Sequence, residues 1–392
     1  MTKAASEVGG LRLRNVLLNP GPVTLSDRVR QAMLRGDWCH REIEFAELTQ
    51  SVNARLAAVY ASAESAAPSG SGPKSHVTSD AGFDAVTLTG SGTAAVEAML
   101  AGFAPDTSKT LVVANGVYGE RIAKILEHQR KPMQLVASPW IEPMDLEEVA
   151  RCLADRADDL PITHIVAVHH ETTTGRLNDL PQLARLASSA GCQLLIDAVS
   201  SFGAESIDFA GWPVTAVAAT ANKCLHAVPG VAFVLARRAV WQAGAQKSAP
   251  SLYLDPFAYY TSQHGDGFSP FTQSVQATFA LDEALSELAD EGGWQARRGL
   301  YRERAARIAG ELAQLDFQPL LDAEDRSCVL CAFRLPSGAN YADLHDQLKR
   351  DGFIIYAGQG HLATDVCRIA NMGDIREADL DRLFESFKRA LA

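Results

Sequence analysis

The chain has 392 residues, which is long enough for two domains with sizeable cores. Its composition, 47% hydrophobic and 21% charged residues, is typical of a globular protein. A formal net charge of −11 argues against a general nucleic-acid-binding surface or an anionic-membrane surface. We expect a cytoplasmic enzyme, because we find neither a basic-then-apolar leader nor an uninterrupted apolar stretch of membrane-spanning length.

The seven cysteines are odd in number and scattered, which does not suggest a secreted disulfide framework. Cys328 and Cys331 form a C-x-x-C pair, but the pair lies in an apolar alternation that predicts a strand. Because no second pair of ligands is nearby, we predict no metal site.

The N-terminal part is predicted to be an arm over residues 1–23, and its first ten residues read as a flexible tail. Two prolines and a glycine in Asn19-Pro20-Gly21-Pro22 force an extended or turning path. Helical spacing follows at 27–35 and 44–60, and then an Ala/Ser/Gly/Pro-rich surface loop at 62–82.

A large domain is predicted over residues 24–275. Short apolar runs alternate there with helical segments, which favours a mainly parallel central sheet covered by helices on both faces. The last run follows its predecessor too closely for an ordinary crossover helix, which favours an antiparallel strand. The predicted strands are 85–88, 110–113, 165–168, 194–196, 214–219 and 231–235.

A smaller C-terminal α+β domain is predicted over residues 276–392. An amphipathic stretch from about 272 to 315 is expected to link it to the large domain. The pattern then predicts a strand, a helix, two strands and a helix, at 328–334, 341–351, 353–356, 366–369 and 376–390.

Polar or glycine-rich residues follow five of the predicted strands directly. In an open parallel sheet, ligands gather outside the carboxyl ends of the strands, so these five junctions should line one edge. They are Gly90 to Thr93, Asn115 to Gly119, His169 to Gly175, Asp197, and Thr220 to Lys223.

Lys223 follows an unusually apolar segment for a lysine. Desolvation lowers the pKa of an amine and activates it for imine formation, as a pyridoxal-phosphate enzyme requires. Taken alone, a lysine is far more often a solvated surface charge. Asp197 at the end of the preceding apolar strand strengthens the interpretation, because a buried carboxylate there could keep a pyridine nitrogen protonated.

The remaining junctions also suit pyridoxal phosphate. A Gly-Ser-Gly-Thr turn that enters a helix offers free backbone N–H groups and hydroxyls to a phosphate. Tyr118 could stack on a planar ring. Each residue has an ordinary alternative: Asp197 as a helix N-cap, the turn without a ligand, and Tyr118 as a core or rim tyrosine. The combination favours the cofactor.

With these residues in place, the chain resembles the class V branch of fold-type I aminotransferases from about Leu17 to its C-terminus. The likeness is greatest to 2-aminoethylphosphonate–pyruvate aminotransferases. It rests on the segments at 18–22, 90–98, 115–121, 171–175, 197–203 and 221–230.

The resemblance implies pyridoxal phosphate bound covalently to Lys223, with Asp197 on the pyridinium nitrogen and Tyr118 stacked on the ring. Thr173, with Thr172, would reach the phenolic oxygen. The phosphate would be held by Ser91, Gly92, Thr93 and Asn222, and by Thr272 of the other subunit of a homodimer with shared active sites.

Arg368 matches the arginine that binds the substrate carboxylate in similar enzymes, and its planar fork suits that task. Arg41 and Asn19 complete the predicted substrate-binding residues. Arg41 could equally pair with Glu44 or Glu47 along a helix. The expected reaction is a ping-pong transamination of 2-aminoethylphosphonate, or a close amino-phosphonate, with pyruvate.

Three alternatives remain open. One is a desulfurase-like lyase, a different chemistry on the same fold, which needs a mobile nucleophilic cysteine; we find no convincing loop that carries one. The segment His40-Arg41 resembles that of glyoxylate-type relatives, which favours alanine– or serine–glyoxylate transamination as the second hypothesis. A non-catalytic protein with the same fold is the third, although Lys223 and Asp197 are both present.

Overall fold

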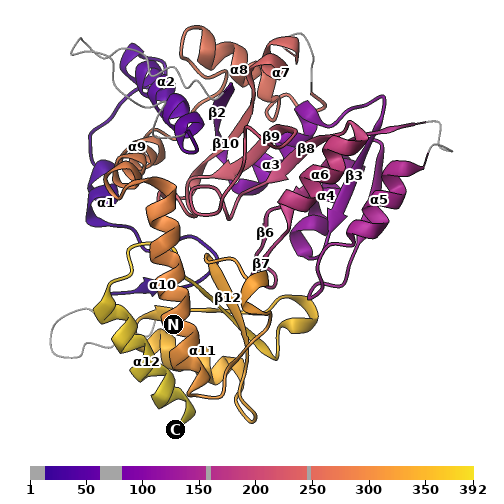
Figure 1. The fold of residues 1–392 in the computed structure, drawn as a ribbon. Helices are drawn as coiled ribbons and strands as arrows, with labels where there is room; N and C mark the ends of the chain where they lie inside the picture. Colours follow the sequence, from indigo (N-terminus) through magenta and orange to yellow (C-terminus); the bar gives the residue numbers. More distant parts are fainter. Residues whose placement is uncertain (1–13, 62–81, 156–159, 245–248) are drawn as a thin grey trace.

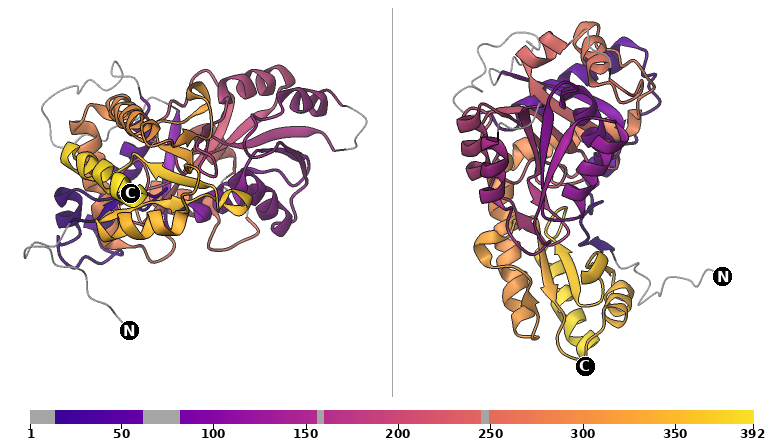
Figure 2. Two further views of the ribbon diagram at one scale, coloured as in Figure 1. Left: turned by 90° about the horizontal axis from the view of Figure 1, so that it is seen from below. Right: turned by 90° about the vertical axis from the view of Figure 1, so that its right-hand side faces the viewer.

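The computed structural model describes residues 14–61, 82–155, 160–244 and 249–392. A large α/β part occupies one end and a smaller α+β part the other, with helix α10 (Gly293–Ala313) running between them (Figure 1). The views in Figure 2 show the same two-part arrangement from below and from the side. The predicted tail and all but the last residue of the predicted 62–82 loop lie outside the described residues.

A seven-stranded sheet forms the centre of the large part, in the order β2-β10-β9-β8-β5-β3-β4. Strand β10 is antiparallel to both neighbours and the other pairs are parallel, which confirms the predicted sheet and its one reversed strand. The strands are β2 (Phe83–Gly90), β3 (Lys109–Ala114), β4 (Met133–Ala137), β5 (Ile162–Val168), β8 (Gln193–Asp197), β9 (Val214–Thr220) and β10 (Gly230–Arg237).

Both faces of this sheet are buried, because alternate residues of each strand enter two separate cores. Leu111 of β3 packs into one core and its neighbour Val112 into the other. The first core takes residues from α1 (Asp27–Ala32), α2 (Ile43–Ala58), α5 (Leu146–Ala154), α6 (Leu180–Ala190) and α9 (Val275–Asp290). The second takes residues from α3 (Gly92–Phe103), α4 (Val117–His128), α7 (Arg238–Gly244) and α8 (Pro256–Gly265).

The amphipathic stretch predicted at 272–315 forms two helices, α9 and α10. Gly292, the N-cap of α10, and Gly293, its first residue, have φ angles of +96° and +84°, a left-handed conformation that breaks a helix and favours glycine. Helix α9 packs into the first core of the large part. The packing of the large part therefore continues past the boundary predicted at residue 275.

The small part contains a four-stranded antiparallel sheet in the order β11-β12-β15-β14. The predicted strand 353–356 is divided between this sheet and a separate short pairing. The elements of the small part are β11 (Gln318–Pro319), β12 (Leu330–Arg334), α11 (Tyr341–Arg350), β13 (Phe353–Ile354), β14 (Tyr356–Ala357), β15 (Val366–Ala370) and α12 (Glu377–Leu391). Short 3-10 helices lie at Ala323–Asp325 and Gly360–Leu362.

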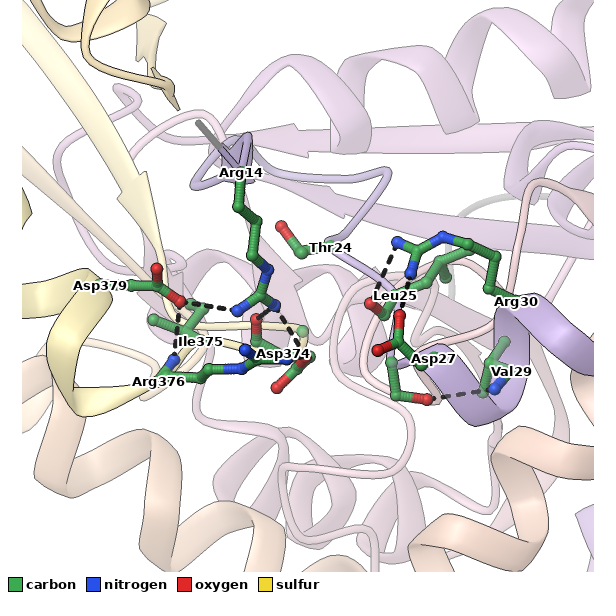
Figure 3. Close-up of polar contacts among 12 residues, drawn as sticks. Arg14, Thr24, Leu25, Asp27, Val29, Arg30, Asp374, Ile375, Arg376 and Asp379 are labelled. Carbon is green, nitrogen blue, oxygen red and sulfur yellow. Dashed lines mark hydrogen bonds and ion pairs between the residues drawn. The ribbon is translucent and has the colours of Figure 1, made fainter. Parts of the chain in front are cut away.

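The N-terminal arm is built into the small part. Strand β1 (Val16–Leu17) pairs in parallel with β13, and Val16 and Leu18 join the small-domain core. The guanidinium of Arg14 lies between two small-domain carboxylates, with its nitrogens 2.7 Å from Asp374 and 2.9 Å from Asp379 (Figure 3). The arm therefore belongs structurally to a domain formed by the last third of the chain.

Within the described residues, none of the helices combines the length and the apolar character that crossing a membrane requires.

Candidate active site

The predicted junctions meet at one edge of the large sheet. Asp197 ends β8 and is in register with Val168 of β5 on one side and Ala218 of β9 on the other. Strand β2 points the same way as β9, because both are antiparallel to β10 between them, so Gly90 reaches this edge as well. The open-sheet rule places a ligand here.

Lys223 lies in the turn between β9 and β10. The backbone N–H of His226 donates to the Lys223 carbonyl at 2.9 Å, and that of Ala227 donates to Ala221 at 3.0 Å, so the turn is fixed. Burial lowers the pKa of the Lys223 amine to about 8, with the charge of Arg368 acting in the same direction and Asp197 opposing it. The neutral fraction of this amine near physiological pH is therefore far larger than that of an ordinary lysine.

The N-terminal arm covers Lys223. The amine donates a hydrogen bond to the carbonyl of Pro20, and Gly21 lies directly against the lysine side chain. A Cβ on Gly21 would lie 2.5 Å from Cδ of Lys223, and the φ angle of Gly21 is +105°. Asn19 is buried beside them, and its Oδ1 has no hydrogen-bond partner among the described residues. Glycine is required at this close approach.

Asp197 presents a buried carboxylate to the same site. Its Oδ1 accepts a hydrogen bond from the backbone N–H of Val199 at 3.0 Å. Burial raises the pKa of Asp197 to about 6, while the Val199 N–H and the charges of Arg121 and Lys223 counteract the rise. The charges of Arg121 and Lys223 therefore favour the ionised form of this carboxylate.

The first turn of α3 carries the predicted phosphate-binding residues. Ser91 is the N-cap of α3, but its side chain makes no capping hydrogen bond, so its hydroxyl and the first backbone N–H groups are available. A Cβ on Gly92 would lie 2.5 Å from Val199, so this turn can approach the Asp197 loop only with glycine. Thr93 accepts a hydrogen bond from Arg121 at 3.4 Å, and Asn222 Oδ1 accepts one from Thr220 at 2.8 Å.

Tyr118 is the second residue of α4. The guanidinium carbon of Arg121 lies 4.7 Å from the centre of its ring, within the range of a cation–π contact. A cavity lined by Gly92, Thr93, Tyr118 and Asp197, among other residues, separates α3 and α4 at this point. The ring thus lies at the edge of the same site.

Thr172 and Thr173 follow the short strand β6 (His170–Glu171), which pairs with β7 (Arg176–Leu177). Both threonines are buried. The Thr173 hydroxyl donates to Oε1 of Glu171 at 2.6 Å and accepts from the backbone N–H of Val117 at 3.1 Å. In this structure, therefore, that hydroxyl is engaged by Glu171.

Glu171 is a further residue of the site, and no role was predicted for it from the sequence. Its carboxylate is completely buried and accepts four hydrogen bonds, two from Thr173 and one each from the backbone of Tyr118 and Gly119. Burial raises its pKa to about 7 against the effect of these donors. Its position beside a predicted strand end was the available signal, but a lone glutamate in a polar turn is ordinary.

Arg368 reaches this edge from β15 of the small domain. Its Nε donates to the Ala357 carbonyl at 2.8 Å, and its Nη1 donates to the Thr172 carbonyl at 2.9 Å. The side chain is buried, which lowers its pKa below the usual value for arginine. Lys223, Asp197 and Arg368, far apart in sequence, thus surround one site.

Two predicted residues lie apart from this group. Arg41 donates to the backbone carbonyls of Ser269 and Pro270, at 2.8 and 3.2 Å. Thr272 is exposed, although the next turn is tied to the end of β2 by a hydrogen bond from the Ser274 N–H to Thr89 at 2.9 Å. Within the chain, Arg41 therefore ties the N-terminal end of α2 to the backbone at 269–270.

Comparison with known proteins identifies the family. The profile of the family described as "Aminotransferase class-V" matches residues 139–383, more than half of the chain. A 2-aminoethylphosphonate–pyruvate transaminase from Bacillus cereus is 34% identical to this chain. The match covers 96% of this chain and 98% of the length of that protein. A 2-aminoethylphosphonate–pyruvate transaminase from Vibrio cholerae is 33% identical, and the match covers 96% of this chain and 97% of the length of that protein.

Solved structures share the fold. An alanine–glyoxylate aminotransferase from Nostoc sp. superposes with a TM-score of 0.84 at 23% identity, covering 100% of this chain and 98% of that one. An aspartate aminotransferase from Thermus thermophilus gives 0.82 at 24% identity, covering 96% and 99%. The fold-type I architecture and the sequence matches agree, and the chain is a member of the class V aminotransferase family.

Proposed function

We propose that the protein is a pyridoxal-phosphate-dependent enzyme that transfers the amino group of 2-aminoethylphosphonate to pyruvate, giving phosphonoacetaldehyde and alanine. The observation that carries the proposal is the meeting of Lys223, Asp197 and Arg368 at one sheet edge, in a chain whose relatives bear that activity in their names.

The residues present fit pyridoxal phosphate. The uncapped first turn of α3 offers N–H groups and the Ser91 hydroxyl to a phosphate. The buried Asp197 carboxylate suits a protonated pyridine nitrogen, and Lys223 suits the aldehyde. When bound, the cofactor supplies an electrophilic carbon for amines and a ring that accepts electrons when a substrate C–H proton leaves.

Three residues of the chain would have separate roles in the reaction. Nζ of Lys223 is a nucleophile when it is neutral, and as a base it can take the proton that the donor carbon loses. Asp197 would stabilise a proton on the ring nitrogen, because a buried carboxylate is out of contact with water and is stabilised by a positively charged partner. Arg368 offers its fork to the carboxylate of the keto acid.

We further propose that the enzyme is a homodimer with shared sites. Thr272 is exposed beside a segment tied to the end of β2, where a second copy could receive it. Leu34 and Leu252 are 74% and 82% exposed, and covering such side chains stabilises an association.

A single-turnover donor screen tests the activity. The cofactor-loaded enzyme is mixed separately with 2-aminoethylphosphonate, alanine and serine, and the change in cofactor absorbance is followed together with the carbonyl product. We expect the fastest conversion with 2-aminoethylphosphonate and none in a Lys223→Ala variant. Slow conversion of 2-aminoethylphosphonate beside fast conversion of alanine or serine would establish the glyoxylate-type alternative instead.

A further inference from the structure

Glu171 links two parts of the site that the sequence places far apart. On one side its Oε2 accepts the backbone N–H groups of Tyr118 and Gly119, at 3.2 and 3.3 Å. On the other, its Oε1 accepts the backbone N–H and the hydroxyl of Thr173, at 3.1 and 2.6 Å. The carboxylate is therefore shared between helix α4 and the turn after β6.

The contact with α4 replaces an ordinary helix cap. The N-cap position is Gly116, which has no side chain to offer, and the first three N–H groups of the helix need acceptors. Glu171 satisfies two of them, and the Thr173 hydroxyl satisfies the third, at Val117. A carboxylate at this end also complements the helix dipole.

The contact with the turn affects the small domain. Thr172 lies between Glu171 and Thr173, and its carbonyl accepts the hydrogen bond from Nη1 of Arg368. The charge of Glu171 also acts on Arg368. This turn thus supplies one of the two backbone carbonyls that hold the guanidinium, the other being that of Ala357.

We propose that Glu171 is a positioning residue for transamination, holding the ring of Tyr118 and the guanidinium of Arg368 in place through α4 and the Thr172–Thr173 turn. This inference rests on the proposed function. It adds to that function a residue that touches neither cofactor nor substrate.

Two variants disturb this contact in different ways. Glu171→Gln keeps the shape but turns one acceptor oxygen into an NH2 group facing N–H donors. Gly116→Ala leaves the carboxylate intact, yet its Cβ would lie 2.3 Å from Cδ of Glu171. Gly116 has an extended φ of 175°, which alanine can adopt, so the substitution acts through that contact.

Matched controls separate the contact from the chemistry of each substitution. Glu147→Gln changes an exposed glutamate on α5, and Gly310→Ala adds a Cβ on α10 that would meet nothing within 4 Å. We expect both controls to behave as the unaltered protein.

The experiment measures the dissociation constant of pyridoxal phosphate by absorbance titration of the cofactor-free protein, and the inhibition constant of propionate against pyruvate. Propionate carries a carboxylate but no reacting carbonyl. We expect both constants to rise about 10- to 100-fold in Glu171→Gln and in Gly116→Ala, because hydrogen bonds to a buried carboxyl group are disturbed and two binding groups shift. Lower melting temperatures with both constants unchanged would show a merely structural role and overturn the inference.

If a variant does not fold, the rate of amide hydrogen exchange in the unaltered protein tests the same contact. Propionate should slow exchange at Tyr118 and Gly119, whose N–H groups are bound by Glu171. Unchanged exchange with propionate bound would count against the link. Failure of the unaltered protein to bind pyridoxal phosphate would instead defeat the proposed function, and the role of Glu171 with it.

Discussion

The amine of Lys223 donates a hydrogen bond to the backbone carbonyl of Pro20, which stands 203 positions earlier in the chain. The next residue, Gly21, lies against the lysine side chain so closely that a Cβ would come within 2.5 Å of it. The N-terminal arm is thus one wall of the lysine's pocket.

Gly21→Ala should therefore impair the site more than it impairs folding. We expect the affinity for pyridoxal phosphate to fall at least about tenfold, because the new methyl displaces the Lys223 side chain. Gly36→Ala is the matched control, since Gly36 has a similar φ of +115° but nothing within 4 Å of its Cβ. Equal losses of affinity in the two variants would attribute the effect to backbone strain alone.

The reactivity of Lys223 should follow its lowered pKa. In the cofactor-free protein the amine should be half protonated near pH 8, so the rate of cofactor binding should rise with pH and level off above about 8. The burial of the charged amine costs stability below pH 8, and this cost should be relieved as pH rises from 8 toward the ordinary value of 10.5. Stopped-flow mixing at a series of pH values measures the profile, and a midpoint near 10.5 would contradict it.

Asp197→Asn should abolish transamination and yet stabilise the cofactor-free protein. The raised pKa of Asp197 means that its ionised form is disfavoured in the folded state, and this cost is fully present above about pH 6. An asparagine can still accept the Val199 N–H, so we expect a gain of about 1–3 kcal/mol in the free energy of unfolding at pH 7.

This advantage of Asp197→Asn should fade toward pH 4, where the carboxyl group of the unaltered protein becomes protonated. Urea unfolding at pH 7 and at pH 4 provides the comparison. A variant that is less stable than the unaltered protein at pH 7 would show that burial of the ionised carboxylate does not destabilise the folded state.

Arg368→Lys should raise KM for pyruvate about 10- to 100-fold while changing the first half-reaction with 2-aminoethylphosphonate much less. A lysine has no planar fork and cannot serve Ala357, Thr172 and a carboxylate together. Separate kinetics of the two half-reactions measure the difference. Arg185→Lys, on the exposed side of α6, is the control, and equal effects on both substrates would argue against a carboxylate-specific role.

Thr272→Ala should weaken the binding of pyridoxal phosphate several-fold without lowering the melting temperature, if the hydroxyl is supplied to a second copy. Light scattering should give twice the mass of the chain. Thr261→Ala, exposed on α8, is the control. A monomeric protein with full cofactor affinity would contradict the shared site.

The sequence predicted the elements whose signal is local and strong. Continuous apolar runs predicted six strands of the large sheet. Strand β4 was not predicted, because it lies at the edge of the sheet, where Leu135 is exposed and the sequence is less continuously apolar. The stretch at 272–315 has helical periodicity throughout, and only the backbone conformation at Gly292 and Gly293 shows that it is two helices.

The site was predictable where residues follow buried strands, as Asp197 and Lys223 do. Contacts between distant segments were not, because periodicity carries no information about them. Arg368 was found only through family resemblance. Nothing local to Glu171 indicates that it caps α4, a helix that begins more than fifty residues earlier.

The pairing of β1 with β13 gives the chain an order of assembly. Residues 16–17 leave the ribosome long before their partners at 353–354, so the strand pairing that anchors Pro20 and Gly21 beside Lys223 can form only after residue 354 has been made. A nascent chain that already contains the lysine still lacks a finished pocket. The pocket around Lys223 is therefore completed only after residues 353 and 354 have been added to the chain.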